Sequence, residues 1–351
     1  MSSSLGMQTT RELNTLAKFT SDGVLIVDKP AGFTSHDVVE VVKKKLGATK
    51  VGHSGTLDPF ATGVLVLLIN GATKLAPFLL DQDKRYRFTV SFGVETDTQD
   101  STGRVVATNR RGPLPEGEIR KACAVFLGEI KQRVPRFSAV RVRGQRLYRL
   151  ARQGVDVTPP CRTVKIKNLD LCDLSWPEVT FEVTCSKGTY VRSLGADLAC
   201  HLDCSGHVSK LRRLASGEFD LRQALTLEQF KQIVDEEEVN QRLITPAQAL
   251  SSYPAIKVNY LAANNIRRGV SLKLREFFEP ESRPEGPYRV LDPDNNLVAM
   301  VSKAVQGAND GKEEEIKFRA LRVFGPISQA MSHRAQRMAP SQKKWTANGK
   351  G

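Results

Sequence analysis

The sequence lacks a long apolar stretch of any kind. None of its uninterrupted apolar runs exceeds that from Val64 to Ile69, whereas a membrane-spanning helix needs ~20 apolar residues. The N-terminal segment from Met1 to Gly23 is polar and contains no hydrophobic signal region. We therefore expect a cytoplasmic protein that does not enter a membrane.

Cysteine is also scarce, with six residues in a chain of 351. This density is too low for the disulfide scaffold of a small secreted protein. Cys200, His201, Cys204 and His207 form one compact group of zinc-ligand types, but their spacing is tighter than in structural zinc sites and no second pair follows. A helix that ends in a turn explains this group better, and we expect no metal.

Two further absences narrow the function. The chain has no internal repeat and no phosphate-binding loop of the GxxxxGK[ST] type, so nothing indicates nucleotide hydrolysis.

Carboxylates are outnumbered, with 38 Asp and Glu against 52 Lys and Arg, which leaves a net charge of +14. Residues 325–351 contribute five of these cations and no acid, so most of the excess lies elsewhere. Such an excess points to a polyanionic partner, and nucleic acid is the first candidate.

The segment from Gly52 to Gly63 concentrates glycines around one histidine and one carboxylate, His53 and Asp58. Glycine can take a positive φ and lets the backbone approach a ligand closely. A carboxylate on such a loop suits a nucleophile or an acid–base catalyst. A turn in which Asp58 only makes a local hydrogen bond explains the same residues, and such turns are common where Gly, Asp and Pro gather.

Hydrophobic periodicity predicts the elements around this segment. Strands are expected at 24–27, 64–69, 85–92 and 179–185, with Tyr86 at the start of the third. Helices are expected at 36–46, near 116–127, and from 190 onward. Thr34 or Ser35 should cap the first helix and Gly47 should end it, while Thr189 should cap the last and place Arg192 in its first turn. Short strands at 288–291, 297–301 and 316–324 predict a small β-rich region.

A stripe of arginines between Arg141 and Arg152 is not interrupted by any carboxylate. If this segment is helical, Arg146, Arg149 and Arg152 share one face, which favours contact with the phosphates of RNA or DNA. The alternative is a solvated charged face. Further basic segments lie at 43–50 and 209–213.

Six motifs in order resemble the TruB family of tRNA pseudouridine synthases. They are Gly-His-Ser-Gly-Thr-Leu-Asp-Pro at 52–59, Lys-Arg-Tyr at 84–86, Gly-Val-Glu-Thr-Asp-Thr-Gln-Asp at 93–100, Gly-Gln-Arg-Leu-Tyr at 144–148, Ser-Lys-Gly-Thr-Tyr-Val-Arg at 186–192 and His-Val-Ser-Lys-Leu-Arg-Arg at 207–213. The resemblance runs from about Gly23 to Leu221. It includes the opening Asp-Lys-Pro-Ala-Gly-Phe-Thr-Ser that begins at Asp28.

The resemblance implies a role for each matching residue. Asp58 matches the catalytic aspartate that attacks the flipped uridine, and Arg192 matches the arginine that pairs with it. Tyr86 matches the tyrosine that stacks on the base and is a candidate for proton transfer. His53 matches the histidine that helps to extrude the target nucleotide. Lys29, Leu211 and Tyr190 match further pocket positions.

The same resemblance implies the fold and the substrate. It implies an α+β fold with a mixed, mainly antiparallel sheet flanked by helices, and a small β-rich PUA-like domain. We expect a flexible leader at 1–22, a catalytic domain at 23–250, the small domain at 252–325 and a disordered basic tail at 326–351. The substrate would be the uridine at position 55 in the T loop of tRNA, isomerised by a monomer without cofactor. The cations expected to bind RNA are Lys43, Lys44, Lys45, Lys84, Arg146, Arg149, Arg152, Lys210, Arg212 and Arg213.

Two other functions are compatible with the same residues. A guide-dependent branch of the superfamily shares the loop around Asp58, although the Lys-Arg-Tyr and arginine-rich segments favour recognition of tRNA without a guide. A non-catalytic tRNA chaperone would need the basic charge but would tolerate loss of Asp58. The intact carboxylate and its matching partners favour the enzyme.

Overall fold

The computed structural model describes residues 18–109, 111–270, 272–273, 286–305 and 316–325. None of the helices in these residues is long and apolar enough to cross a membrane. The predicted leader is wrong at its end, because Phe19 is buried in an apolar cluster and its carbonyl accepts a hydrogen bond from Asn70 Nδ2. The rest of that leader, up to residue 17, and the predicted basic tail lie outside the described residues.

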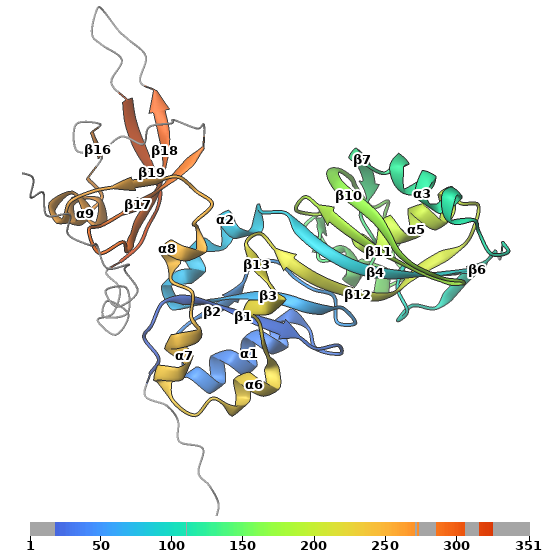
Figure 1. The fold of residues 1–351 in the computed structure, drawn as a ribbon, viewed down its shortest axis with the longest axis horizontal. Helices are drawn as coiled ribbons and strands as arrows, with labels where there is room; N and C mark the ends of the chain where they lie inside the picture. Colours follow the sequence, from blue (N-terminus) through green and yellow to red (C-terminus); the bar gives the residue numbers. More distant parts are fainter. Residues whose placement is uncertain (1–17, 110, 271, 274–285, 306–315, 326–351) are drawn as a thin grey trace, which may run out of the picture.

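Within the described residues, a ten-stranded sheet forms the centre of the molecule (Figure 1). Its main path follows the order β14-β1-β3-β12-β4-β11-β10-β7. These strands span Leu225–Thr226, Gly23–Lys29, Thr62–Ile69, Gly206–Ser216, Lys84–Phe92, Glu178–Cys185, Cys161–Ser175 and Gly128–Arg133. Two further strands, β2 (Val51–His53) and β13 (Phe219–Asp220), pair with β3 and β12. Most neighbours are antiparallel, which confirms the expected mixed sheet.

The junction between β3 and β12 differs from its neighbours. These strands are parallel and pair only Arg212 with Thr62 and Arg213 with Gly63, whereas β12 pairs with β4 along most of its length. The junction divides the sheet into a half that contains β1 and β3 and a half that contains β12, β4 and β11. Gly63 has φ +105°, and a Cβ there would lie 2.2 Å from the Arg213 carbonyl oxygen, so only glycine fits.

Helix α1 (Ser35–Leu46) covers the half that contains β1 and β3. Its ends confirm the sequence signals. Thr34 Oγ1 accepts from Asp37 N, the Asp37 carboxylate accepts from Thr34 N, and Gly47 ends the helix in the left-handed conformation. The apolar side of α1 packs with α6 (Leu227–Gln232) and α7 (Glu236–Arg242) against side chains of β1 and β3.

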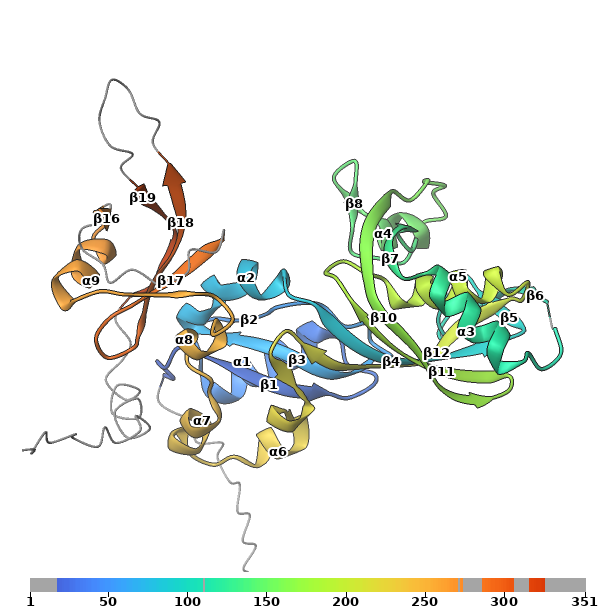
Figure 2. The same ribbon diagram turned by 45° about the horizontal axis from the view of Figure 1, so that its top comes forward.

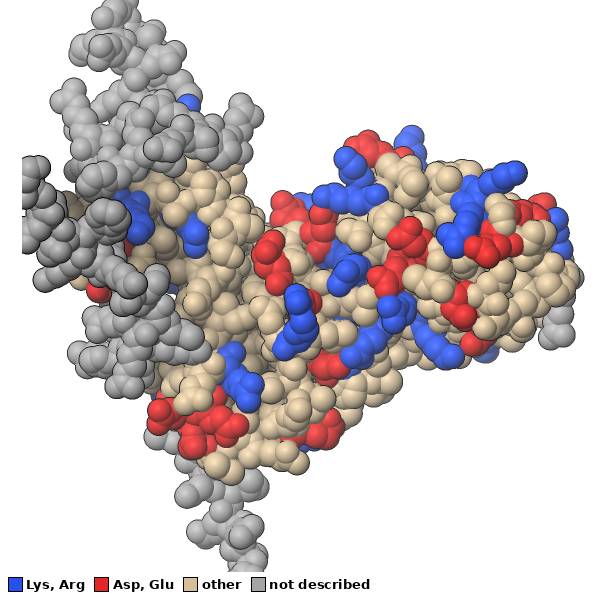
Figure 3. All heavy atoms as spheres, viewed as in Figure 1, with Lys and Arg blue, Asp and Glu red and all other residues tan. Residues whose placement is uncertain are grey.

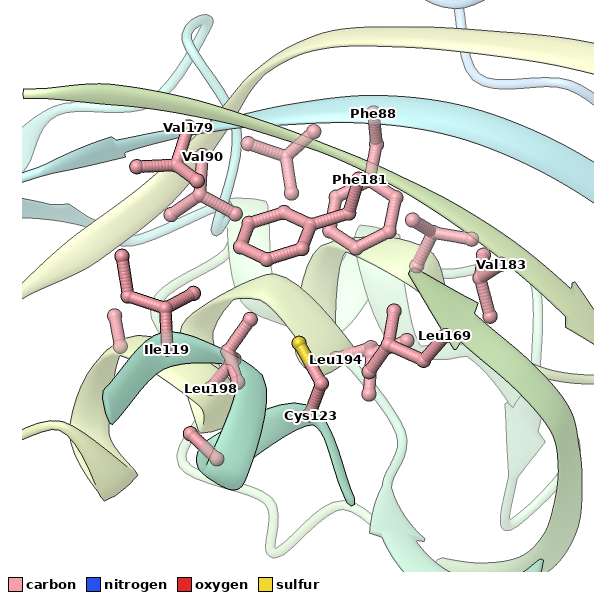
Figure 4. Close-up of a cluster of buried hydrophobic side chains, with 14 of the residues drawn as sticks. Phe88, Val90, Ile119, Cys123, Leu169, Val179, Phe181, Val183, Leu194 and Leu198 are labelled. Carbon is pink, nitrogen blue, oxygen red and sulfur yellow. The ribbon is translucent and has the colours of Figure 1, made fainter. Parts of the chain in front are cut away.

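The other half packs its apolar face against α3 (Glu116–Val125) and α5 (Val191–His201). Figure 4 shows Phe88 and Phe181 stacked between the sheet and these helices, with ring centres 5.4 Å apart. Phe88, Val90 and Phe92 are buried on one face of β4, as the alternation predicts, and Tyr86 packs against the same cluster. The predicted Thr189 cap is wrong. Tyr190 is the N-cap residue, and Thr189 Oγ1 donates to the Ser186 carbonyl instead.

Residues 134–160 form an arm between β7 and β10, which Figure 2 shows projecting beyond the sheet. The arm contains the hairpin of β8 (Arg141–Val142) and β9 (Gln145–Arg146), followed by α4 (Leu147–Arg152). Arg143 and Gly144 both have positive φ, as a two-residue hairpin turn requires. The expectation that Arg146 lies on a helix with Arg149 and Arg152 is therefore wrong, because Arg146 ends β9 and precedes the helix.

A second sheet lies next to three elements that link it to the central sheet. These are η1 (Asn70–Leu75), α2 (Ala76–Leu80) and α8 (Pro246–Ala249). Its order is β15-β17-β18-β19-β16, with strands at Ala255–Lys257, Pro287–Leu291, Leu297–Val305, Ile316–Val323 and Leu272–Lys273. Helix α9 (Tyr260–Arg267) lies beside it. Leu291, Leu297 and Met300 pack into one apolar cluster with Leu75 and Leu250, so the two sheets share a buried contact. The remaining elements, β5 (Val94–Thr96), β6 (Val105–Thr108) and η2 (Leu221–Gln223), are short.

Candidate active site

The loop that carries Asp58 is held on both sides of the aspartate. It connects β2 to β3, and Leu57 N donates to Ser35 Oγ at 2.8 Å while Ser35 Oγ donates to the Leu57 carbonyl at 3.2 Å. On the other side, the Pro59 carbonyl accepts from Gly32 N at 2.9 Å and from Lys29 Nζ at 3.2 Å. The aspartate is thus fixed between two anchored neighbours, as a preorganised site requires.

Lys29 is fully buried beneath this loop. Besides Pro59, its Nζ donates to the carbonyls of Pro30 at 2.8 Å and Phe33 at 2.7 Å. An ammonium group has three N–H donors, so three carbonyl partners use all of them. Burial lowers the pKa of Lys29 to about 8, and the nearby negative charge of Asp58 opposes that shift. The predicted pocket residue therefore contacts the backbone that carries the aspartate.

Arg192 contacts Asp58 at two points. Its Nε lies 2.9 Å from Asp58 Oδ2, and its Nη2 donates to Asp58 Oδ1 at 3.4 Å. The side chain of Arg192 is 4% exposed and that of Asp58 is 35% exposed. Because a guanidinium is planar, this fork fixes the orientation of the carboxylate and leaves part of it accessible.

The other side of the Arg192 guanidinium is occupied as well. Nη1 donates to Asp100 Oδ2 at 3.1 Å and to the Thr98 carbonyl at 2.7 Å, and Nη2 donates to the Phe137 carbonyl at 3.0 Å. Asp100 is buried and accepts from the Thr102 backbone N–H at 3.0 Å. One guanidinium thus contacts two carboxylates and donates to two backbone carbonyls.

The charge state of Asp58 reflects these opposing neighbours. Burial raises the pKa of Asp58, the positive charge of Arg192 lowers it, and the negative charge of Asp100 raises it again. A carboxylate with a raised pKa is more basic in its ionised form than a solvated one. The arrangement can supply an oriented, partly accessible nucleophile or base.

Tyr86 and Arg213 are paired across neighbouring strands on the side of the sheet that packs against α5. Burial raises the pKa of the Tyr86 hydroxyl, and the charge of Arg213 opposes this. Arg213 is 1% exposed, and it donates from Nε to the Val64 carbonyl at 2.6 Å and from Nη2 to the Gly55 carbonyl at 3.1 Å. Arg213 therefore connects the tyrosine strand to the loop that carries Asp58.

Three more predicted residues lie in this region. Leu211 is buried opposite Phe88 on β12. Tyr190 is half-buried, with the Arg162 guanidinium 5.4 Å from its ring centre. His53 ends β2, and burial and the charge of Arg213 lower its pKa, which favours the neutral imidazole at pH 7. Within the part of the chain that the structure describes, His53 Nδ1 has no hydrogen-bond partner.

Comparisons with known proteins place the chain in a family. The model of the N-terminal domain of the TruB family of pseudouridylate synthases matches residues 43–191, and the model of the C-terminal domain of tRNA pseudouridylate synthase B matches residues 192–251. A protein of Syntrophobacter fumaroxidans named tRNA pseudouridine synthase B is 45% identical over 284 residues, which are 79% of this chain and 92% of that protein. The chain belongs to the TruB family. A relative of the same name from Geobacter sulfurreducens is 41% identical over 86% of this chain and 99% of its own length.

Solved structures with the TruB-like fold are more distant. A Cbf5–Nop10–Gar1 complex contains a chain that is 26% identical, with a TM-score of 0.68 over 90% of this chain and 88% of that chain. An H/ACA ribonucleoprotein bound to a substrate RNA contains one that is 25% identical, with a TM-score of 0.66 over 87% of this chain and 85% of that chain. These likenesses agree with the mixed central sheet.

Two of the cations expected to bind RNA are buried in this TruB-family chain. Arg213 is enclosed by the backbone groups described above. Lys84 Nζ donates to the carbonyls of Leu80 at 2.7 Å and Gln82 at 2.5 Å, and burial lowers its pKa to about 8. The Lys84 ammonium and the Arg213 guanidinium both donate to carbonyls of the protein itself. The expectation that they contact RNA phosphates is therefore wrong.

Strand alternation separates Lys210 and Arg212 from the pocket. Cross-strand partners share a face, and Lys210 and Arg212 pair with Thr89 and Arg87, whereas Leu211 and Arg213 pair with Phe88 and Tyr86. Lys210 and Arg212 therefore lie on the opposite side of the sheet from Tyr86. They form ion pairs with Glu178 and Asp28. Figure 3 shows Lys and Arg interspersed with Asp and Glu over β4, β11 and β12, so this face carries mixed charge.

The remaining predicted groups lie at a helix end and in a turn. Lys43, Lys44 and Lys45 form the last turn of α1, where Lys45 Nζ donates to the Lys231 carbonyl. Their role in RNA binding stays a prediction, as does that of the arm arginines. Helix α5 ends at His201 and β12 begins at Gly206, in agreement with a helix running into a turn. No group of three His, Cys, Asp or Glu side chains suited to a metal occurs in the described ranges.

Sequence reasoning missed three contributors to the site. Asp100 ends a quoted motif and contacts Arg192, but its place in a Thr- and Asp-rich turn gave no separate signal. The Phe137 contact is a backbone carbonyl, which no side-chain pattern reveals. Gln132 is fully buried, donates to the Tyr190 carbonyl at 3.0 Å and accepts from Tyr190 N at 2.7 Å. The sequence gives no sign that this glutamine is buried, because only the folded structure places β7 beside α5.

Proposed function

We propose that this protein isomerises uridine to pseudouridine at position 55 in the T loop of tRNA. The observation that carries the proposal is the two-point contact between Arg192 and Asp58, placed near Tyr86 in a chain whose relatives are named tRNA pseudouridine synthase B. We propose further that the enzyme acts as a monomer in the cytoplasm, with the T arm of tRNA as its partner.

The chemistry needs no second substrate. The bond between N1 of the base and C1′ of the ribose breaks, the base rotates, and a bond forms between C5 and C1′. C5 loses its proton and N1 gains one, so substrate and product have the same atoms and the same oxidation state. Held geometry, one nucleophile and proton transfer are sufficient, which is why we propose that neither metal nor cofactor takes part.

Each pocket residue has a task in this reaction. The base must leave its stack before it can react, at a cost of about a few kcal/mol, and stacking on Tyr86 would offset roughly 1–3 kcal/mol. Asp58 attacks the nucleoside as the carboxylate, and the bond it forms breaks again by the time C5 is joined to C1′, so the carboxylate is regenerated. Arg192 fixes its orientation. His53 would contact the nucleotide as it leaves the stack. Lys29 and Arg213 hold the loop that carries Asp58.

The test is the Asp58→Asn variant, which keeps the shape of the side chain but removes the nucleophile. Tritium released from tRNA labelled at C5 of uridine should fall by more than about a thousandfold, while tRNA binding is retained. Asp173→Asn, an exposed carboxylate on β10, is the matched control and should keep full activity. Activity should also persist in EDTA. Turnover of Asp58→Asn within about tenfold of the unaltered protein would contradict the assignment.

A guide-dependent activity is the second candidate, because one of the matching solved structures is an H/ACA ribonucleoprotein bound to a substrate RNA. The identity to the relatives named tRNA pseudouridine synthase B is higher, at 41–45%. Purified protein with a T-arm transcript and no other RNA should therefore form pseudouridine. Product formed only after a guide RNA is added would favour the second candidate. A chaperone would bind the transcript and form no product in either case.

The domain boundaries are also part of the proposal. The family model for the C-terminal region ends at residue 251, where the chain enters the second sheet. We propose that 23–250 is the catalytic domain and that 252–325 is a PUA-like domain that contacts RNA. Ultraviolet crosslinking of bound tRNA should label both regions, and labels confined to 23–250 would contradict this division.

A further inference from the structure

Helix α5 carries Arg192 in its first turn, but in the described part of the chain it has no side-chain cap of its own. The N-cap residue is Tyr190, and its side chain makes no capping hydrogen bond. By contrast, α1 and α6 are capped by Thr34 and Thr226, which directly precede them. The first N–H groups of a helix have no partner within the helix. For Tyr190 N, the partner comes from a distant strand.

That partner is the side chain of Gln132, near the end of β7. Its Oε1 accepts from Tyr190 N at 2.7 Å, and its Nε2 donates to the Tyr190 carbonyl at 3.0 Å. Because the Tyr190 backbone is extended, one side-chain amide supplies the donor and the acceptor that an opposite strand residue would supply. Gln132 is fully buried, and burial of a polar group is costly unless hydrogen bonds replace those to water. Both ends of this amide have such a partner.

The residues that follow Gln132 contact the same turn of α5. The Arg133 carbonyl accepts from Ser193 Oγ at 3.2 Å, and the Phe137 carbonyl accepts from Arg192 Nη2 at 3.0 Å. Ser193 is itself buried. One continuous segment, from the end of β7 to the start of the arm, therefore holds the beginning of the helix.

The ring of Tyr190 is held from the same pair of strands. Arg162 on β10 is the cross-strand partner of Gln132, and its guanidinium carbon lies 5.4 Å from the centre of the Tyr190 ring. Its Nη1 also donates to the Gly188 carbonyl at 3.4 Å. One cross-strand pair thus fixes both the backbone and the ring of the residue that begins α5.

We propose that Gln132 is a positioning residue for the reaction, which acts through Tyr190 and the first turn of α5 to set where Arg192 meets Asp58. Arg192 lies two residues after Tyr190, so a displacement of the Tyr190 backbone moves the base of the arginine side chain. A misplacement of about 1 Å at a reacting centre can cost about a hundredfold in rate. The proposal rests on the proposed function, because it takes the Asp58 carboxylate as the nucleophile.

The test is Gln132→Met, which keeps the length of the side chain and removes both hydrogen bonds. With a T-arm transcript, kcat should fall by about tenfold or more, while the affinity for the transcript stays within about twofold. Thr226→Val removes the cap of α6 and is the matched control: it should lower the melting temperature and leave kcat unchanged. Gln132→Asn retains the amide but is one methylene shorter, and it should lose kcat in the same way. This second variant provides the test if the methionine variant does not fold.

A second measurement does not depend on turnover. Burial raises the pKa of Asp58 and the charge of Arg192 lowers it, and the other charges that act on Asp58 are those of Asp100 and Lys29. With aspartate labelled at its carboxyl carbon, the NMR resonance that is lost in Asp58→Asn should titrate at higher pH in Gln132→Met than in the unaltered protein, because the arginine has moved away. An unchanged titration midpoint, or an unchanged kcat in active protein, would overturn the proposal. Absence of pseudouridine from the unaltered protein would instead contradict the proposed function, and the titration still decides whether Gln132 positions Arg192.

Discussion

The pocket and the arm use arginine in opposite ways. In the pocket, Arg192 and Arg213 are buried, and their N–H groups donate to carboxylates and backbone carbonyls of segments distant in sequence. In the arm, Arg146, Arg149 and Arg152 are exposed, and the guanidinium carbons of Arg146 and Arg152 lie 6.0 Å and 5.8 Å from the centre of the Tyr148 ring. A buried cation with fixed partners orients other groups, whereas an exposed cation without a carboxylate is available to a polyanion. Changes in the two regions should therefore affect different measurements.

The largest effect is expected from Arg192→Met. This change leaves Asp58 and Asp100 without the cation between them, so the free energy of unfolding should fall by about 3–5 kcal/mol. Tritium release should fall by more than about a thousandfold, because the carboxylate loses its orientation. Urea unfolding and the release assay measure the two effects. Arg120→Met removes an exposed ion pair with Glu116 and should lower the free energy of unfolding by less than about 1 kcal/mol. If the two variants lowered stability and activity equally, the buried contacts of Arg192 would have no particular role in either.

Tyr86→Phe should have the next largest effect. If the hydroxyl transfers a proton, kcat should fall by about a hundredfold or more while tRNA affinity stays nearly constant. Tyr86→Ala removes the stacking ring as well and should also weaken binding. The kinetic constants and affinities of both variants distinguish these contributions. A fully active phenylalanine variant would reduce Tyr86 to a stacking role.

Reversing the arm charges should change binding and leave the pocket intact. Arg146, Arg149 and Arg152 are replaced together by Glu. Each lost phosphate contact lowers the log–log salt slope by up to about 0.7–0.9, so the slope should become shallower by roughly two. The melting temperature should not change, because exposed residues contribute little to the core. A control with Arg104, Arg120 and Arg222 reversed has the same net charge. An equal loss of affinity in the control would show that the arm has no special place in binding.

The smallest expected effect comes from pH. The pKa of buried Lys29 is lowered from 10.5 to about 8, so in the folded protein its ammonium loses its proton as pH rises through about 8. A neutral amine has only two N–H donors for three carbonyls, and kcat should decline several-fold on this alkaline side. Lys84 also has a pKa of about 8, and Lys84→Gln serves as the control. The decline should persist in that variant. A flat profile between pH 7 and 9.5 would contradict this role of Lys29.

Local features of the fold could be predicted from the sequence where the residues that interact are near one another in the chain. The Thr34 cap with its Asp37 partner and the terminating Gly47 were visible because each depends on a few neighbouring residues. The alternation of Tyr86, Phe88 and Val90 revealed a strand face in the same way. The family motifs also pointed to Asp58 and Arg192, which the structure brings within 2.9 Å although they are far apart in sequence.

Two of the errors concern cations whose partners are backbone carbonyls, which no side-chain pattern reveals. Arg213 was expected to meet RNA, but its partners are carbonyls of Val64 and Gly55, which only the pairing of β12 with β3 brings near. Lys84 is likewise surrounded by carbonyls of the turn before it. Charge alone gives no sign of burial, so a basic segment predicts RNA contact whether its members face solvent or the interior.

The short parallel junction between β3 and β12 has a consequence for folding. Asp58 is attached to the half of the sheet that contains β3, whereas Tyr86 and Arg192 belong to the half that contains β12 and β4. The groups that we propose for catalysis therefore come together only when the two halves have joined. A chain in which either half has formed alone is enzymatically silent, so recovery of turnover during refolding reports the closing of that junction rather than the formation of either half.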